Sequence, residues 1–319
     1  MSATADPGSA ASSTPRAEDG AERSAADIRA DYRTSFDELN RRLATTKLDR
    51  HVRFFNFGYV PLPGEVALGP TLSRAFPNPD SAQLLFQLIA DADAELHDAL
   101  VVEVGSGRGG NLGLLHDLVG ARAGIGVDLT FASVAFASQA INSGGGFVQG
   151  DAEVLPIASG VADAALNIES AGCYPNIEQF FREVARILRP GGWFLYADLI
   201  HHGILPAYRR VLDQLGFALV TDRDITANVL ASRERRADRE RLALGEAGPD
   251  ALAEWVGQGG SVLHGALGDG AWAYQILRLR RTDASPYAGE APLFSAEEQA
   301  TIHANSAFWA DVLHLDASS

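Results

Sequence analysis

Short apolar runs alternate with segments of helical periodicity along most of the chain. Apolar positions three or four apart predict helices, whereas short continuous apolar runs bounded by turn residues predict buried strands. Seven strands are expected, at residues 100–104, 123–127, 146–149, 162–167, 193–199, 218–221 and 273–279. Helices are expected at residues 28–48, 81–92, 111–119, 129–143, 177–188, 207–215, 226–257 and 295–313. Because strands and helices alternate, we expect an α/β fold with a parallel, doubly wound sheet.

Both ends of the chain depart from this pattern. The N-terminal segment is rich in Ala, Ser, Gly and acidic residues, so it buries too little apolar surface to fold and is expected to be disordered. The expected divisions are a tail at 1–26, one domain at 27–281 with cap helices at about 27–60 and 226–257, and a helical extension at 282–319. The last helix begins with Ser295 and Glu298 at capping-box spacing. It either covers the sheet or contacts a second copy in a homo-oligomer.

Charge and cysteine content exclude several classes of protein. The net charge is −15 and no stripe of Lys and Arg is evident, which argues against a nucleic-acid partner. Cys173 is the single cysteine, which excludes an intrachain disulfide and fits a cytoplasmic location. No apolar run approaches the roughly 20 residues that span a bilayer. No cluster of His, Asp and Glu has ligand spacing, so we expect no metal.

A glycine-rich turn joins the first strand to its helix, in the sequence Glu103-Val104-Gly105-Ser106-Gly107-Arg108-Gly109-Gly110-Asn111. Glycines at such a turn let the backbone approach a ligand closely. The spacing fits the dinucleotide fingerprint G-x-G-x-x-G through Gly110. It also fits an acid-x-G-x-G-x-G form through Gly109, and a tight turn without a ligand is a third interpretation. The loop alone therefore leaves the cofactor undecided.

Motifs after the later strands favour one of these cofactors. Asp128 ends the second strand, where a carboxylate can accept both ribose hydroxyls or can cap the next helix. Gly150-Asp151-Ala152-Glu153 follows the third strand, and Asn167-Ile168-Glu169 ends the fourth. Arg189-Pro190-Gly191-Gly192 precedes the fifth. This order is similar to that of class I S-adenosylmethionine-dependent methyltransferases, and a nicotinamide dehydrogenase gives no reason for it.

The stretch 147–199 closely resembles mycobacterial phthiotriol dimycocerosate O-methyltransferases and related actinobacterial polyketide and sugar O-methyltransferases. The matching segments are Gly150-Asp151-Ala152-Glu153, Leu166-Asn167-Ile168-Glu169, Cys173-Tyr174-Pro175 and Tyr196-Ala197-Asp198-Leu199. Weaker matches at 54–59 and 224–230 extend the resemblance over about 50–281. It implies a seven-stranded Rossmann-like methyltransferase sheet with helical cap insertions, and S-adenosylmethionine as cofactor. The residues that it implies for the cofactor are Glu103, Gly105, Ser106, Gly107, Gly109, Asn111, Asp128, Asp151, Ala152, Asn167 and Glu169.

The catalytic group is less well marked than the cofactor site. Methyl transfer to a hydroxyl needs alignment and a base near the leaving proton. Asp198 matches a carboxylate of related sugar O-methyltransferases and is the first candidate, with His201 and His202 directly behind it. Tyr174 is expected either to orient the substrate through its hydroxyl or simply to pack. Relatives often carry a histidine where this chain has Gly172, so His201 or His202 substitutes, or the acceptor needs little help, or the reaction is not methylation.

Together these features predict transfer of a methyl group to a hydroxyl of an apolar natural product in secondary metabolism, such as antibiotic biosynthesis. The aromatic stretch 54–59 and the helices at 226–257 are expected to form a lid over the site, or alternatively ordinary core. Three other functions stay open: a cyclisation or rearrangement with S-adenosylmethionine bound, C- or N-methylation, and a non-catalytic scaffold.

Overall fold

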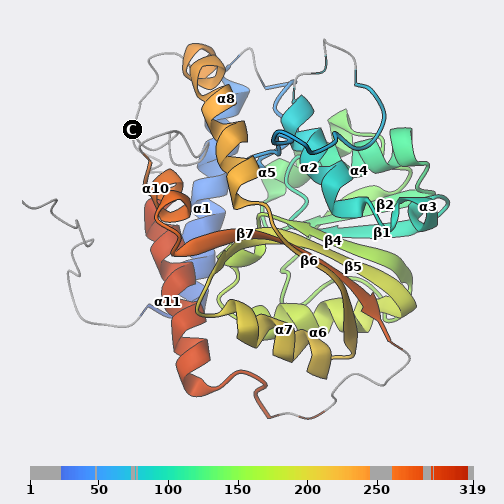
Figure 1. The fold of residues 1–319 in the computed structure, drawn as a ribbon, viewed down its shortest axis with the longest axis vertical. Helices are drawn as coiled ribbons and strands as arrows, with labels where there is room; N and C mark the ends of the chain where they lie inside the picture. The colour runs from blue at the N-terminus through green and yellow to red at the C-terminus, as the bar shows by residue number, and fades with distance from the viewer. Residues whose placement is uncertain are drawn as a thin grey trace, which may run out of the picture.

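The computed structural model describes residues 23–46, 49–72, 76, 78–244, 261–282, 289 and 291–314. Its centre is one sheet in the order β3-β2-β1-β4-β5-β7-β6 (Figure 1). The strands are β1 (Leu100–Val104), β2 (Ala123–Asp128), β3 (Gly146–Gln149), β4 (Ala162–Ile168), β5 (Leu188–His201), β6 (Phe217–Asp224) and β7 (Trp272–Arg281). The first five strands pair in parallel, whereas β7 runs antiparallel to both β5 and β6. The predicted α/β fold with seven strands is confirmed, but the sheet is mixed and not parallel throughout, because β7 is antiparallel to its two neighbours.

Helices cover both faces of the sheet. The longer ones are α1 (Ala25–Ala44), α2 (Pro79–Ile89), α5 (Phe131–Ala140), α6 (Ile177–Ile187), α7 (Leu205–Gln214), α8 (Thr226–Leu244) and α11 (Ala296–Val312). The short ones are α3 (Asp93–Leu96), α4 (Gly110–Leu114) and α10 (Val262–Gly268). In Figure 1, α6 and α7 lie on one face, while α2 and α4 lie on the other. Parallel strands covered on both sides read as nearly continuous apolar runs, as the sequence does here.

Two apolar cores result, one on each face. Successive side chains of a strand point to opposite faces. Accordingly, Trp193 and Leu195 of β5 belong to the core that includes α2, whereas Phe194 and Tyr196 belong to the core beneath α6 and α7. All four side chains are at most 5% exposed. Because each strand is packed on both faces, the strand ends that carry the candidate site residues are held in fixed positions.

The C-terminal helix packs within the same molecule. α11 runs beside α1 (Figure 1), and the Tyr32 hydroxyl donates to the backbone oxygen of Ser306 at 2.8 Å. Its capping box is present, since the Ser295 side chain accepts from the Glu298 amide and the Glu298 carboxylate accepts from the Ser295 amide. Trp309 packs against Trp272 of β7, with ring centroids 5.1 Å apart. Of the two expected roles, this helix therefore covers the fold.

Several element boundaries differ from the sequence-based expectation. β5 already begins at Leu188, five residues before the expected start, because residues 189–192, expected only to end the preceding helix, form part of the strand. β6 extends to Asp224, three residues beyond the expected end. Helix α1 begins at Ala25, inside the expected disordered tail, because Ser24 and Asp27 form a capping box. The remainder of that tail, residues 1–22, and residues 245–257 of the expected cap lie outside the described residues.

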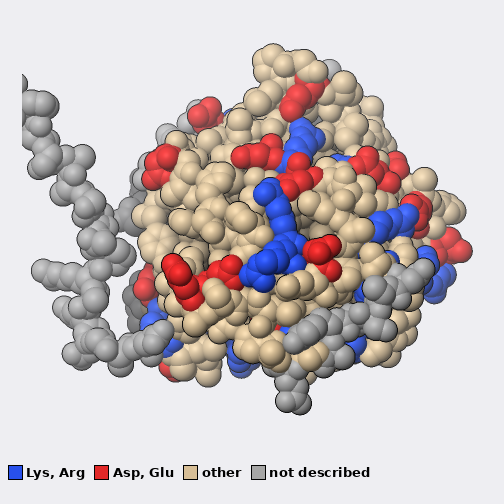
Figure 2. Space-filling view, turned by 60° about the horizontal axis from the view of Figure 1, so that its bottom comes forward, with Lys and Arg blue, Asp and Glu red and all other residues tan. Residues whose placement is uncertain are grey.

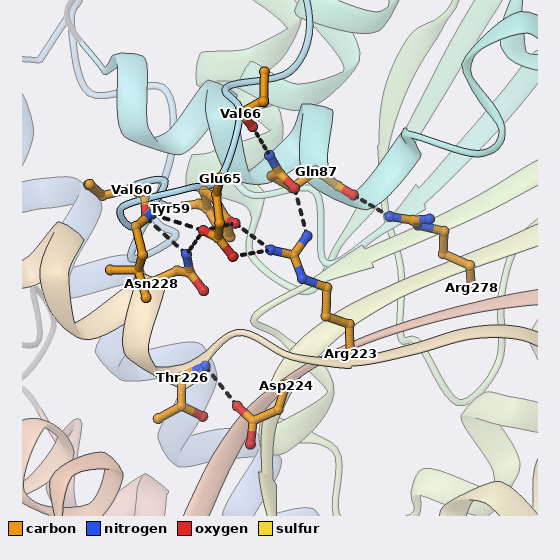
Figure 3. Close-up of polar contacts among 11 residues, drawn as sticks. Tyr59, Val60, Glu65, Val66, Gln87, Arg223, Asp224, Thr226, Asn228 and Arg278 are labelled. Atoms are coloured by element: carbon orange, nitrogen blue, oxygen red, sulfur yellow. Dashed lines mark hydrogen bonds and ion pairs between the residues drawn. The ribbon is translucent and has the colours of Figure 1, made fainter.

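A polar cluster fastens the segment after the aromatic stretch to β6 and α8 (Figure 3). The Glu65 carboxylate accepts hydrogen bonds from the Tyr59 hydroxyl at 2.8 Å and from the Asn228 amide. It also pairs with the Arg223 guanidinium at 2.9 Å, and that guanidinium donates to the Gln87 side chain of α2 at 2.8 Å. The Glu65 carboxylate thereby joins its own segment directly to β6 and α8, and Arg223 links this cluster to α2.

Charged side chains of both signs lie beside one another on the surface in Figure 2. On α6, Arg182 pairs with Glu178 and Arg186 pairs with Glu183, each at 2.7 Å. No helix in the described ranges combines the length and the apolarity that crossing a bilayer requires.

Candidate active site

The glycine-rich loop connects the end of β1 at Val104 to the start of α4 at Gly110. Gly105 has φ +70°, a conformation that side-chain-bearing residues rarely adopt. A Cβ on Gly105 would lie 2.0 Å from the Ser170 hydroxyl oxygen and 2.8 Å from the Tyr174 hydroxyl oxygen. The loop therefore passes directly over the end of β4, and only glycine fits at this position.

A cavity with about 940 Å³ of empty space, including its opening, lies over this loop at the carboxyl ends of the parallel strands. Ligands of open α/β sheets bind at this edge. Of the residues expected to bind the cofactor, Glu103, Gly105, Ser106, Gly107, Asn111, Asp128, Asp151, Ala152 and Glu169 line it. Gly109 and Asn167 do not. Gly109 instead precedes α4 in the left-handed conformation, and Asn167 donates to the Val104 carbonyl at 3.0 Å beneath the loop.

Polar atoms on the wall of this cavity lack partners among the described residues. Glu103 Oε1 accepts from the Asn111 amide at 2.7 Å, but Glu103 Oε2, Asn111 Oδ1 and the Ser106 hydroxyl are buried without a hydrogen bond. Burial raises the pKa of Glu103 to about 8. Unpaired buried polar atoms are costly, so their clustering here indicates a ligand that supplies hydrogen-bond donors and positive charge. The α-ammonium group of S-adenosylmethionine fits that requirement.

Two further carboxylates shape the cavity. Asp128 Oδ2 accepts from the Gly107 amide at 2.7 Å, and Oδ1 accepts from the Thr130 amide at 3.0 Å, so Asp128 fixes the glycine loop. The N-cap of α5 is Thr130 rather than Asp128. Asp151 lies beside Arg29 of α1, with 3.6 Å between Oδ2 and Nε. Arg29 also lines the cavity, and no local motif marks it in the sequence.

A second, mainly apolar cavity with about 650 Å³ of empty space, including its opening, adjoins the first. We call it the acceptor cavity. It is lined by Phe36, Phe55, Phe57, Glu169, Gly172, Cys173, Asp198, Leu199, Leu263, Trp309 and Leu313. Phe36, Phe55, Glu169 and Cys173 line both cavities. Phe55 and Phe57 of the expected aromatic lid line this cavity. Phe54 and Tyr59 do not line it and are buried in the core.

The acceptor cavity has two ionisable carboxyl groups on its wall. Glu169 Oε1 accepts from the Phe57 amide and from the Tyr274 hydroxyl, each at 2.7 Å, and Glu169 itself has φ +50°. Asp198 accepts from the amides of Ala171 and Leu199, each at 2.7 Å. Burial raises the pKa of Glu169 to about 8 and that of Asp198 to about 6. Near neutral pH the first group holds a proton and the second does not.

The other candidate catalytic residues lie elsewhere. His201 and His202 line neither cavity. His201 ends β5, packs edge-on against Trp272 at 5.3 Å and accepts from the Gly203 amide at 3.2 Å. The Tyr174 hydroxyl lies 2.6 Å from the Ser170 hydroxyl oxygen, under the glycine loop, and Tyr174 lines the glycine-loop cavity but not the acceptor cavity. Among the described residues, no group of His, Cys, Asp or Glu is arranged to hold a metal ion.

Comparisons with known proteins agree with this architecture. A family model described as a methyltransferase domain matches residues 102–196. The chain is 34% identical over 249 residues to a fatty-acid O-methyltransferase of Mycolicibacterium smegmatis, which covers 77% of this chain and 86% of the relative. It is 30% identical over 208 residues to a phthiotriol/phenolphthiotriol dimycocerosates methyltransferase of Mycobacterium tuberculosis, covering 64% of this chain and 77% of the relative.

Solved structures share the fold at low identity. A geranyl diphosphate C-methyltransferase from Streptomyces coelicolor is 18% identical with a TM-score of 0.55, covering 78% of this chain and 98% of the other. The cyclase SpnF has the same identity and TM-score, covering 84% and 100%. Sheet order, glycine loop and sequence relatives together define a class I methyltransferase. The chain belongs to the S-adenosylmethionine-dependent methyltransferase family, in which S-adenosylmethionine is the methyl donor.

Proposed function

We propose that this enzyme transfers a methyl group to an oxygen atom of an apolar, lipid-like acceptor. The observation that carries the proposal is the apolar cavity that adjoins the glycine-loop cavity across a shared wall containing Glu169. The names of the two relatives point to the same class, since one acts on fatty acids and the other on phthiotriol dimycocerosates. An apolar pocket with few polar groups suits such a substrate, because the polar groups fix its orientation.

The residues around the glycine loop are proposed to hold the cofactor. Bound S-adenosylmethionine supplies a methyl group activated by a positively charged sulfonium. Glu103 and Asn111 would accept from its ammonium group, which gives Glu103 Oε2 and Asn111 Oδ1 the partners they lack. Asp128 would accept from the ribose hydroxyls, and Asp151 with the Ala152 amide would bind the adenine edge. The remaining glycines shape the loop so that its backbone approaches the ligand.

For a hydroxyl acceptor, Asp198 is the proposed base. It lines the acceptor cavity and is deprotonated near neutral pH, because its pKa is about 6. Asp198 would take the hydroxyl proton as the acceptor oxygen accepts the methyl group that bound S-adenosylmethionine would supply. Glu169 keeps its own proton at that pH and would donate a hydrogen bond that orients the acceptor oxygen. Neither His201 nor His202 has a part in this step.

A carboxylic acid is a second candidate acceptor group. No described histidine side chain lines either cavity, and a carboxylate loses its proton in solution and needs no base. In that case protonated Glu169 would hold the substrate carboxylate, and the product would be a methyl ester. The relative named as a fatty-acid O-methyltransferase favours this alternative.

One experiment distinguishes these possibilities. The purified enzyme is incubated with S-adenosylmethionine and either a straight-chain fatty acid or the fatty alcohol of equal length. The masses of the products are then measured by mass spectrometry. A gain of one methyl group that mild alkali removes indicates an ester, whereas an alkali-stable gain indicates an ether. Consumption of substrate without a change of mass would instead reveal a rearrangement. Absence of any methylated product from either acceptor would contradict the proposed substrate class.

A further inference from the structure

One wall of the acceptor cavity comes from helices outside the region that matches the family model. Trp309 of α11, Leu313 directly after it and Leu263 of α10 line the acceptor cavity. None of the three lines the glycine-loop cavity. The wall that the two cavities share contains Glu169 and Cys173. Leu263, Trp309 and Leu313 therefore belong to the acceptor cavity alone and not to the wall that the two cavities share.

This wall is rigid at Trp309. The side chain is 5% exposed and packs edge-on against Trp272 of β7, 5.1 Å away, and against Phe308, 4.9 Å away. Such perpendicular aromatic pairs hold both rings in a defined orientation. The hydrogen bond from Tyr32 to the Ser306 carbonyl ties α11 to α1 one turn earlier. Since the sheet and α1 both fix Trp309, the indole cannot move aside without disturbing the core.

We propose that Trp309 and Leu313 form the closed end of a subsite for the apolar chain of the acceptor, and so limit the length of the chain that the enzyme accepts. The inference rests on the proposed function, because it needs an acceptor whose reacting oxygen lies at Glu169 and Asp198. Beyond those two carboxyl groups the cavity presents apolar side chains, so the occupant of this end is a hydrocarbon chain and not a polar group. A chain longer than the cavity would meet the indole of Trp309.

Variants of opposite size test this limit. Trp309→Ala enlarges the closed end and is expected to move the preferred substrate to longer chains within a series of straight-chain fatty acids. Leu313→Trp fills the same end and is expected to move it to shorter chains. One methylene in a hydrophobic pocket changes discrimination by about 10-fold to 200-fold, so the ratio of kcat/KM for long and short acids should change by at least about tenfold in each variant.

Phe308→Ala is the matched control. Phe308 packs on Trp309 but does not line the acceptor cavity. When Phe308 is removed, Trp272 and the hydrogen bond between Tyr32 and Ser306 still hold Trp309 and its helix, so the variant loses packing without losing a cavity-lining side chain. Binding of the same fatty acids is measured by calorimetry, which reports on the subsite without turnover. The control should keep the chain-length preference of the native enzyme in both binding and rate.

The possible outcomes distinguish the proposed chain-length subsite from the proposed function. Opposite shifts in Trp309→Ala and Leu313→Trp, with none in Phe308→Ala, support the subsite. A chain-length preference that is unchanged in both cavity variants overturns it, while methylation of fatty acids by the native enzyme would leave the proposed function standing. A native enzyme that neither binds nor methylates any member of the series contradicts the proposed function, and the inference falls with it.

Discussion

The glycine-loop cavity and the acceptor cavity adjoin one another, yet they are built in different ways. The first is formed largely by residues that directly follow β1, β2, β3 and β4, and by backbone amides such as that of Gly107. The second takes its walls from segments far apart in the sequence, from Phe36 in α1 to Leu313 at the other end of the described chain. The first site is therefore built mainly on the strand ends, with additions from α1 such as Arg29, whereas the second is assembled almost entirely by tertiary packing.

Their charged groups differ as well. In the glycine-loop cavity, Glu103 has an unpaired buried oxygen, which a cationic ligand would satisfy. In the acceptor cavity, Glu169 and Asp198 have hydrogen-bond partners from the protein, and both face an apolar space. Burial raises the pKa in all three carboxyl groups. The comparison suggests that the first carboxylate serves binding, whereas the other two serve orientation and proton transfer.

The largest effect is expected from Asp198→Asn. If Asp198 is the base, methylation of a hydroxyl acceptor should fall by about 100-fold to 10,000-fold, while S-adenosylmethionine affinity stays near its native value. The native rate on that acceptor should rise with pH through about 6, as Asp198 loses its proton. Methylation rates and calorimetric affinities measure these effects. A melting curve shows whether the weakened hydrogen bonds from the Ala171 and Leu199 amides destabilise the variant. A variant within about tenfold of the native rate would exclude Asp198 as the base.

Gly105→Ala should act on the other cavity alone. The added Cβ would collide with the Ser170 hydroxyl and would require φ +70° of an alanine, so the loop must shift. Strain of about 3 kcal/mol corresponds to a loss of about 100-fold in S-adenosylmethionine affinity, measured by calorimetry. Gly160→Ala is matched to it, because Gly160 has φ +67° and open space around the added atom. Equal affinities in the two variants would show that the contact with Ser170 does not matter.

The difference in origin explains how far the sequence predicts each region. Asp128 and Asp151 follow consecutive strands, and the carboxyl ends of parallel strands meet at one edge, so their convergence on one cavity follows from the order of motifs. No sequence motif marks Arg29 as part of the glycine-loop cavity or Trp309 as part of the acceptor cavity. Helical periodicity marks neighbouring positions as buried, but it does not say which wall they form.

The histidines show a different limit. His201 and His202 were attractive as bases because they directly follow Asp198 in sequence. β5, however, continues through His201 and pairs with Trp272 of β7. At about 3.3 Å per residue, the strand carries His201 about 10 Å beyond Asp198. Closeness in sequence to Asp198, the proposed base, therefore does not bring a side chain into the same cavity when the strand continues beyond it.

Glu169→Gln should reveal the buried acid through the pH dependence of stability. The pKa of Glu169 rises from 4.5 in the unfolded chain to about 8 in the folded one. The stabilising effect of its proton is complete below about 4.5 and is lost as the pH rises to about 8. Glutamine does not ionise, so the free energy of unfolding of the variant should exceed that of the native enzyme by on the order of 5 kcal/mol above that window. Denaturant unfolding across the range measures this gain.

Glu103→Gln provides the comparison between the two cavities. Burial raises the pKa of the native Glu103 carboxyl group from 4.5 to about 8, as it does for Glu169. Without ligand, Glu103→Gln should therefore raise the free energy of unfolding at high pH by a similar amount. With S-adenosylmethionine bound, the gain at Glu103 should disappear, because the cation stabilises the charged carboxylate, whereas the gain at Glu169 should persist. If binding of S-adenosylmethionine removed the stability increase in both variants, the two carboxyl groups would share one electrostatic environment.

The smallest effect is expected from Glu65→Gln, which lies in neither cavity. The carboxylate holds Tyr59, Arg223 and Asn228 together (Figure 3), but its side chain is 33% exposed, so solvent screens the charge. Loss of the charge should lower the free energy of unfolding by about 1 kcal/mol, with cofactor affinity and chain-length preference unchanged. Glu95→Gln, which breaks a more exposed pair with Arg280, should cost less. A Glu65 variant with altered chain-length preference would show that this anchor also shapes the acceptor cavity, which would then depend on long-range packing even more than its walls indicate.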